Sequence, residues 1–228
     1  MRANNKLNKM RKDFIIILAW PEGLVTASGS WYDKYFATNG KYRVGHSALA
    51  LVNSATSKIH YFDFGRYHTP DGFGRIRDTE TDPDAGIKQL AKINGSGIQN
   101  IEEILIEISN NKSYHGEGAL YSSVISGVNF DSAFDFAKKW QEKGAIPYGP
   151  FIRNGTNCSR FVATISRKAE PSFLKKLRLK LPFCISPSPK RNISIANTNY
   201  YIVKEHKCEK INRSTLRAYF SGIEKKDE

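Results

Sequence analysis

One cysteine of this 228-residue sequence stands where a nucleophilic thiol would need to be. Cys158 follows the loop Asn-Gly-Thr-Asn and opens a segment with helical apolar spacing, so we expect its thiol at a helix N-terminus. Backbone N–H groups and the helix dipole stabilise a thiolate there. The same N–H groups can form an oxyanion hole. The alternative is a small buried side chain near a helix start, because free cysteines are often buried.

A histidine far upstream supplies the base that such a thiol requires. His46 lies between Gly45 and Ser47 and opens a strand of small and aliphatic residues. Imidazole titrates near neutral pH and can take a proton from a nucleophile within hydrogen-bond reach. The alternative is an ordinary core or edge histidine whose ring is satisfied by its neighbours.

The imidazole also needs an acceptor that orients it, and the following strand offers two candidates. His60 and Asp63 are an odd number of residues apart, so in a regular strand they point to opposite faces. We favour Asp63, because a carboxyl on the face of Ile59 and Tyr61 requires a partner. The alternatives are that His60 orients the imidazole, or that neither residue does.

The elements that must position these residues follow from local patterns. Apolar and β-branched runs predict strands at 14–20, 44–52, 58–64 and 198–205, with the middle two forming an antiparallel hairpin. Helical periodicity predicts helices from a cap at Asp131 to Gly144 and from Cys158 to Arg167. A short helix is expected at 30–37, whereas 99–109 fits a strand or a helix. The expected irregular parts are the connection 66–86, a proline-containing excursion at 169–192, and a short helix with a charged tail in the last fifteen residues.

The order of these motifs resembles a known superfamily. Gly45-His46-Ser47-Ala48-Leu49, a strand with a polar residue, and then Asn157-Cys158-Ser159-Arg160-Phe161-Val162 resemble the circularly permuted branch of the NlpC-type papain-like superfamily. Lecithin retinol acyltransferase and related thiol phospholipases belong to that branch. The stretch 61–83 also resembles an uncharacterised family common in Bacteroidetes.

The resemblance covers residues 14–168 and implies an α+β, papain-like fold, in which the nucleophile helix packs on one face of an antiparallel sheet. It implies Cys158 as the nucleophile, His46 as the base, and Asp63 or His60 as the third polar residue. The sequence leaves that third position open, because the acyltransferase relatives have a histidine there.

Several other residues receive weaker assignments. We expect Asn157, Ser159, Tyr148 and Arg66 on the substrate-binding side of the site. Arg66, Arg75 and Arg77 could bind an anionic substrate group, but we expect them to be solvated loop arginines. Cys184 and Cys208 have no activating context, so we expect them to be structural.

The net charge of +13 is concentrated in two segments, the first dozen residues and 167–191. Solvated basic segments are the expected interpretation, and binding to nucleic acid or an anionic surface is the alternative. No specific nucleic-acid motif and no metal-ligand spacing is present, so we expect no cofactor. The expected organisation is a basic segment at 1–13, a catalytic domain at 14–168 and a basic extension at 169–228 packed on that domain.

These patterns together predict a thiol hydrolase that cleaves an amide bond, a peptidase or amidase of cell-wall-type peptides. The alternatives are a lipid acyl hydrolase or acyltransferase, and an inactive papain-like module that binds an anionic partner. Three cysteines without paired spacing fit a reducing compartment, and no apolar stretch approaches the ~20 residues of a membrane span. We therefore expect a soluble, cytoplasmic protein with a peptide or acyl substrate. The oligomeric state is not indicated.

Overall fold

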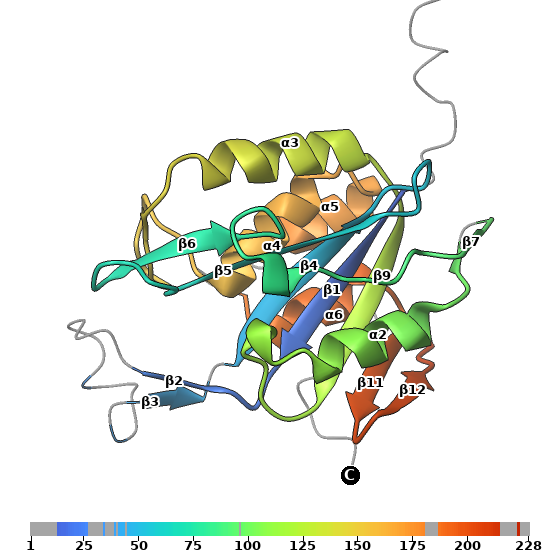
Figure 1. Ribbon diagram of the computed structural model, residues 1–228, viewed down its shortest axis with the longest axis horizontal. Coiled ribbons are helices and arrows are strands. Elements are labelled where there is room, and N and C mark those ends of the chain that lie inside the picture. Colours follow the sequence, from blue (N-terminus) through green and yellow to red (C-terminus); the bar gives the residue numbers. More distant parts are fainter. Residues whose placement is uncertain are drawn as a thin grey trace, which may run out of the picture.

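Eight antiparallel strands form the main sheet of the computed structural model, which describes residues 13–26, 34, 39, 41–43, 45–95, 97–180, 187–214 and 223 (Figure 1). In spatial order the strands are β10 (Ile146–Pro147), β6 (Phe73–Arg77), β5 (Ile59–Gly65), β4 (His46–Val52), β1 (Asp13–Trp20), β9 (Leu120–Val128), β11 (Tyr200–Lys204) and β12 (Lys207–Ile211). Two further sheets have two strands each, β2 (Leu24–Thr26) with β3 (Lys41–Arg43), and β7 (Ile93–Asn94) with β8 (Gly97–Ile98).

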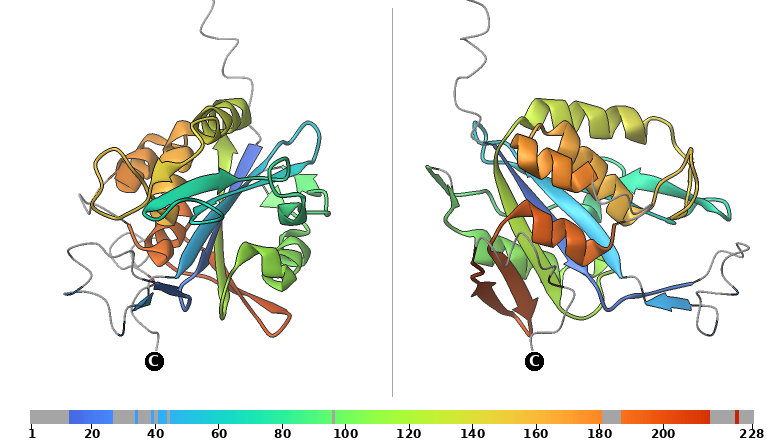
Figure 2. Two further views of the ribbon diagram at one scale, coloured as in Figure 1. Left: turned by 60° about the vertical axis from the view of Figure 1, so that its left-hand side comes forward. Right: turned by 180° about the vertical axis from the view of Figure 1, so that it is seen from behind.

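Five α-helices lie on the two faces of this sheet in the described part of the chain. They are α2 (Ile101–Asn110), α3 (Phe130–Gln141), α4 (Cys158–Lys168), α5 (Phe173–Lys180) and α6 (Pro189–Ala196). The α3, α4 and α6 helices cover one face, α5 packs on α4 and α6, and α2 covers the opposite face (Figure 2). Single 3-10 turns occur at Pro83–Ala85 and Lys112–Tyr114. This is the expected α+β architecture.

The central strand β1 explains why the sheet needs helices on both faces. Every residue from Phe14 to Trp20 is buried. Ile15 and Ile17 face the core under α3, α4 and α6, whereas Ile16 and Leu18 face the core under α2. A strand buried on both faces has a continuous apolar sequence rather than an alternating one, and FIIILAW has that pattern.

The predicted strands at 14–20, 44–52, 58–64 and 198–205 correspond to β1, β4, β5 and β11. The ambiguous segment 99–109 is helical, as α2. The cap predicted at Asp131 is wrong by two residues, because the Asn129 side chain accepts the Ser132 N–H at 3.0 Å and Asp131 lies in the first turn of α3. The expectations for 30–37 and for the charged tail fall almost wholly outside the described residues.

The irregular excursion predicted at 169–192 is wrong, because this segment contains α5 and the start of α6. Pro189 is compatible with a helix because it occupies the first turn, where its missing N–H would have no partner anyway. The long connection 66–86 likewise contains strand β6. The central strand β9 was not predicted, because its serines and glycine hide the apolar pattern.

Candidate active site

Close packing at Gly45 fixes the backbone just before His46, the first residue of β4. Gly45 has φ +65°, and a Cβ added there would lie 2.1 Å from the Trp20 carbonyl oxygen, so only glycine fits. His46 then pairs in register with Trp20 of β1. The two rings stack with centroids 5.9 Å apart and planes 23° from parallel. The indole therefore fixes the plane of the imidazole.

Asp63 of β5 accepts hydrogen bonds from four side chains and is completely buried. His46 Nε2 lies 3.2 Å from Oδ2, and the hydroxyls of Tyr61 and Tyr67 donate to the same oxygen at 3.0 and 2.9 Å. Arg77 binds both carboxylate oxygens, with Nε 3.0 Å from Oδ1 and Nη2 2.6 Å from Oδ2. The imidazole also interacts with the Cys158 thiol, so it lies between the carboxylate and the sulfur.

Cys158 is the first residue of α4, which agrees with the position expected from the sequence. The Asn157 side chain caps this helix by accepting the Arg160 N–H at 2.9 Å. From α6, the buried Asn192 donates to the Ser159 carbonyl at 2.9 Å and ties the first turn to the body of the protein. The orientation of the thiol thus depends on α6 as well as on α4.

The sulfur lies where two strands separate. β4 and β5 remain paired as far as Ala48 and Asp63. Beyond this point the Ser47 N–H has no strand partner in that pairing and interacts instead with the Cys158 sulfur. Cys158 is 6% exposed, and polar groups lie beside its sulfur, among them His46 and the Ser159 hydroxyl at 3.9 Å.

The charges of this cluster favour an ionised pair. Burial alone would lower the pKa of His46, but hydrogen bonds with Asp63 and Cys158 outweigh burial and raise the pKa to about 9. Burial would raise the pKa of Cys158, yet the contact with His46 lowers it below its ordinary value. The pKa of Asp63 is also lowered, because His46 and Arg77 outweigh its burial. A thiolate beside an imidazolium is the state that these shifts favour.

His60, the alternative third residue, lies away from this cluster. Its ring packs against Phe130 and Phe134 at centroid distances of 5.3 and 5.2 Å. Burial lowers the pKa of His60. The odd spacing between His60 and Asp63 places only Asp63 beside His46.

The four residues expected near the substrate differ in what they contact. The Tyr148 hydroxyl interacts with both the Cys158 sulfur and its backbone N–H, while the Tyr148 ring stacks on Phe64 at 5.5 Å. The Arg66 guanidinium lies 5.5 Å from the centre of the Tyr148 ring. Ser159 is buried beside the sulfur, so it contacts the thiol rather than the surface of the site. Asn157 acts as the helix cap.

Sequence reasoning missed much of the support around His46. The expectation of solvated loop arginines is wrong for Arg77, which is 3% exposed and paired with Asp63, and for Arg75, whose guanidinium binds Asp82 at 2.6 and 2.7 Å. Arg77 also lies over the Tyr67 ring, 3.6 Å from its centre. Asp63 on β5 and Arg77 on β6 are directly opposite each other in the strand register. A search for an opposite charge across from Asp63 could therefore have found Arg77.

Comparisons with known proteins identify the family to which this chain belongs. The family model of the Type VI secretion system effector TseH-like proteins matches residues 15–172, which include all three residues of the cluster. The chain belongs to the TseH-like family. The fold is similar to that in the crystal structure of the Type VI secretion system effector TseH, with a TM-score of 0.59 and 20% identity, covering 88% of this chain and 98% of that one. A search of curated proteins found no match.

Membership in this family corrects one expectation and leaves another unsupported. The expected cytoplasmic location is wrong, because a Type VI secretion effector is secreted or delivered into target cells. The free cysteines suggested a reducing compartment, but they say nothing about export by this route. The resemblance to a Bacteroidetes family is not confirmed by these matches. Among the described residues, no helix is long and apolar enough to span a bilayer.

Proposed function

We propose that this TseH-like protein is a papain-like thiol hydrolase of the permuted NlpC type that cleaves amide bonds in cell-wall-type peptides. The observation that carries the proposal is the cluster of Cys158, His46 and Asp63, with the thiol at a helix N-terminus and the imidazole between thiol and carboxylate. Membership in a family of secreted effectors supports a target outside the producing cell.

In the proposed reaction, the Cys158 thiolate attacks the carbonyl carbon of a bound amide. The Tyr148 hydroxyl lies beside the sulfur and can donate a hydrogen bond to the oxyanion that forms. The Cys158 backbone N–H, which contacts that hydroxyl, can donate to the oxyanion once it exchanges this contact for the substrate. The imidazolium of His46 then protonates the leaving nitrogen as the C–N bond breaks, and an amine leaves behind a thioester on Cys158.

Deacylation completes the cycle with water. Neutral His46 takes a proton from a water molecule, whose oxygen attacks the thioester carbonyl. Collapse of this intermediate breaks the C–S bond, releases a carboxylic acid and regenerates the thiolate with its imidazolium. Asp63 stays ionised throughout and holds the imidazole by Nε2, while Arg77 keeps the carboxylate in place.

Thiol labelling tests the nucleophile independently of any substrate. Cys208 provides an internal control, because burial and nearby Glu102 raise the pKa of its thiol to about 11. At neutral pH we expect iodoacetamide to modify Cys158 at least about tenfold faster than Cys208, and His46→Ala to abolish that difference. Equal, slow labelling of both thiols would contradict an activated Cys158.

Digestion of purified peptidoglycan tests the substrate. We expect the wild-type protein to release peptide fragments carrying new amine and carboxylate ends, detected by mass spectrometry, whereas Cys158→Ala releases none. Selective labelling of Cys158 without cleavage of peptidoglycan would retain a thiol hydrolase but reject this substrate. Release of fatty acid from phospholipid, with no peptide cleavage, would point to the acyl hydrolase alternative.

A further inference from the structure

The α5 helix exposes large apolar side chains to solvent. Phe173, Leu174 and Leu177 are 76%, 59% and 40% exposed. Elsewhere in the described part of the chain, only Leu90 and Phe151 are large apolar residues with comparable exposure, and each lies in a separate segment. Three such residues within five positions of one helix form a contiguous patch, and patches of this kind mark interaction sites.

Helical geometry places these three side chains on one side of α5. At about 100° per residue, Phe173, Leu177 and Leu174 fall within an arc of roughly 100°. Leu179 lies nearly opposite the centre of this arc and is buried against Ala163 and Ile195. The α5 helix is therefore anchored by its inner side and turns its apolar side outward. It lies over α4, on the outside of the helical layer (Figure 2).

Positive charge borders the apolar side. On the same helical projection Lys176 and Lys180 lie along one margin and Arg178 along the other, and Lys176 and Lys180 are exposed. The helix contains no acidic residue. Across the wider segment 167–191, eight residues are Lys or Arg and a single residue, Glu170, is acidic.

This combination discriminates between possible partners. A solvated basic segment or a nucleic-acid surface requires the cations, but exposed leucines contribute to neither. A stable protein interface needs far more area than three side chains on a two-turn helix provide. An amphipathic helix that lies in the plane of a membrane surface needs both features, apolar residues to insert and Lys or Arg for anionic headgroups.

We propose that α5 binds the surface of membranes rich in anionic phospholipid, with Phe173, Leu174 and Leu177 inserted at the boundary between headgroups and acyl chains. Lys176 and Lys180 contact the lipid phosphates. This interaction holds the protein at a membrane without crossing it. It does not depend on the hydrolase activity proposed above, because α5 contributes no side chain to the Cys158 cluster.

Vesicle sedimentation with the full-length protein tests the proposal. In 0.1 M salt we expect binding to vesicles of phosphatidylglycerol and phosphatidylcholine at least about tenfold tighter than to phosphatidylcholine alone. The double substitution Leu174→Glu and Leu177→Glu should weaken this binding at least about tenfold. Leu90→Glu makes the same chemical change at a residue of similar exposure, 58%, and should leave binding unchanged.

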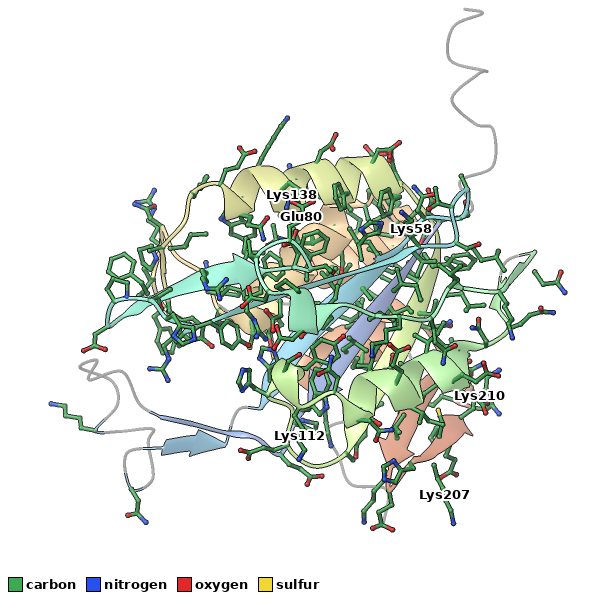
Figure 3. All side chains as sticks on the ribbon, in the orientation of Figure 1. Lys58, Glu80, Lys112, Lys138, Lys207 and Lys210 are labelled. Atoms are coloured by element: carbon green, nitrogen blue, oxygen red, sulfur yellow. The ribbon has the colours of Figure 1, made fainter. Side chains whose placement is uncertain are left out.

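Charge reversal provides a second matched pair. Lys176→Glu with Lys180→Glu should weaken binding at least about tenfold. Lys207→Glu with Lys210→Glu, on strand β12 and away from α5, should weaken it less than about threefold (Figure 3). Circular dichroism checks that all variants are folded, which is expected because the substituted side chains are exposed.

Three results would overturn the proposal. The first is no preference of the wild-type protein for anionic vesicles. The second is unchanged binding after Leu174→Glu and Leu177→Glu, which would leave only general electrostatic attraction. The third is a concentration-dependent dimer, seen by sedimentation equilibrium, that the two Glu substitutions dissociate while vesicle binding is absent. In that case the apolar side of α5 would be covered by a second copy of the chain.

Discussion

At the scale of single residues, the buried ion pair of Arg77 and Asp63 lies directly behind the proposed base. The two side chains are 4% and 0% exposed. The carboxylate also accepts hydrogen bonds from two tyrosine hydroxyls and the imidazole, and these compensate its negative charge together with Arg77. Removing one partner of such a pair leaves an uncompensated charge in the interior, which is far more destabilising than losing a surface pair.

We therefore expect Arg77→Gln to reduce the free energy of unfolding by about 3 kcal/mol. Arg75→Gln is the comparison, since the Arg75–Asp82 pair is more exposed, at 23% and 15%, and it should lose less free energy of unfolding than Arg77→Gln. Urea unfolding followed by circular dichroism measures both values. Similar losses of unfolding free energy for the two variants would mean that Arg77 is not needed to compensate the buried charge of Asp63.

The pH dependence of activity follows from the same cluster. With the pKa of His46 raised to about 9, we expect kcat/KM on a peptide substrate to fall above pH 9, where the imidazolium loses its proton. On the acid side, kcat/KM should rise as Cys158 ionises, at a pH below the ordinary thiol pKa. The proton on His46 also stabilises the fold. That contribution is complete below the ordinary histidine pKa of 6.5 and is lost as the pH rises through 9.

Asp63→Asn tests the origin of the raised pKa. It replaces the carboxylate that raises the pKa of His46, so the alkaline limb of kcat/KM should move down by about one pH unit or more. Rates are compared for the folded fraction at each pH, because this variant also leaves Arg77 without its partner. An alkaline limb that stays at pH 9 would show that another group controls it.

At the scale of elements, two helices with the same kind of cap allow stability to be separated from chemistry. Asn157 caps α4 and Asn129 caps α3, each through a side-chain oxygen about 3 Å from a backbone N–H. Asn157→Ala and Asn129→Ala should each lower the free energy of unfolding by about 1 kcal/mol.

Only the first substitution should change the chemistry of the site. Loss of the α4 cap disturbs the turn that carries Cys158, so the rate of thiol alkylation at neutral pH should fall several-fold in Asn157→Ala. The rate should stay at the wild-type value in Asn129→Ala. A matching decrease in both variants would trace the effect to general stability rather than to the N-terminus of α4.

The elements that sequence patterns predicted are those whose patterns are local. β1 is a continuous apolar run, β4 and β5 form a hairpin across a short polar turn, and α4 follows a loop rich in Gly and Asn. The odd spacing of His60 and Asp63 separated the two candidates correctly by sheet face. These features depend on residues that are close in sequence, so local sequence patterns predict them.

The elements that were missed depend on distant partners. β9 contains Ser122 and Ser123, which are fully buried and lower its apolar character, yet it is held between β1 and β11. Arg77 is one of several arginines in a polar stretch, and only the pairing of β6 with β5 brings it to Asp63. Tertiary pairing, rather than propensity, decides the position of both.

At the scale of the whole molecule, the segment beyond residue 172 completes the sheet and its cover. The family match ends at 172, before α5, α6, β11 and β12. β11 pairs with the edge of β9, and α6 packs on β1 and β9, with Ile193 and Ala196 fully buried. Without this segment an inner strand would become an edge, and apolar surface on β1 would be uncovered.

A chain that ends at residue 172 should therefore aggregate, because exposed strand edges pair with other chains. Size-exclusion chromatography of freshly purified protein measures this outcome. The full-length variant with Leu174→Glu and Leu177→Glu is the control and should elute as the wild-type protein does, since α5 contributes only Leu179 to a buried cluster. A stable, monomeric 1–172 fragment would show that the family-matched part folds by itself.

The chain order of the site has a consequence for synthesis. The strands that carry His46 and Asp63 leave the ribosome first, and 95 positions separate Asp63 from Cys158. At about 5–20 residues per second, translation takes roughly 5–20 s to cover that interval. A nascent chain therefore holds the proposed base and its carboxylate before it has the proposed nucleophile, so a translation product that ends before residue 158 lacks the proposed active site.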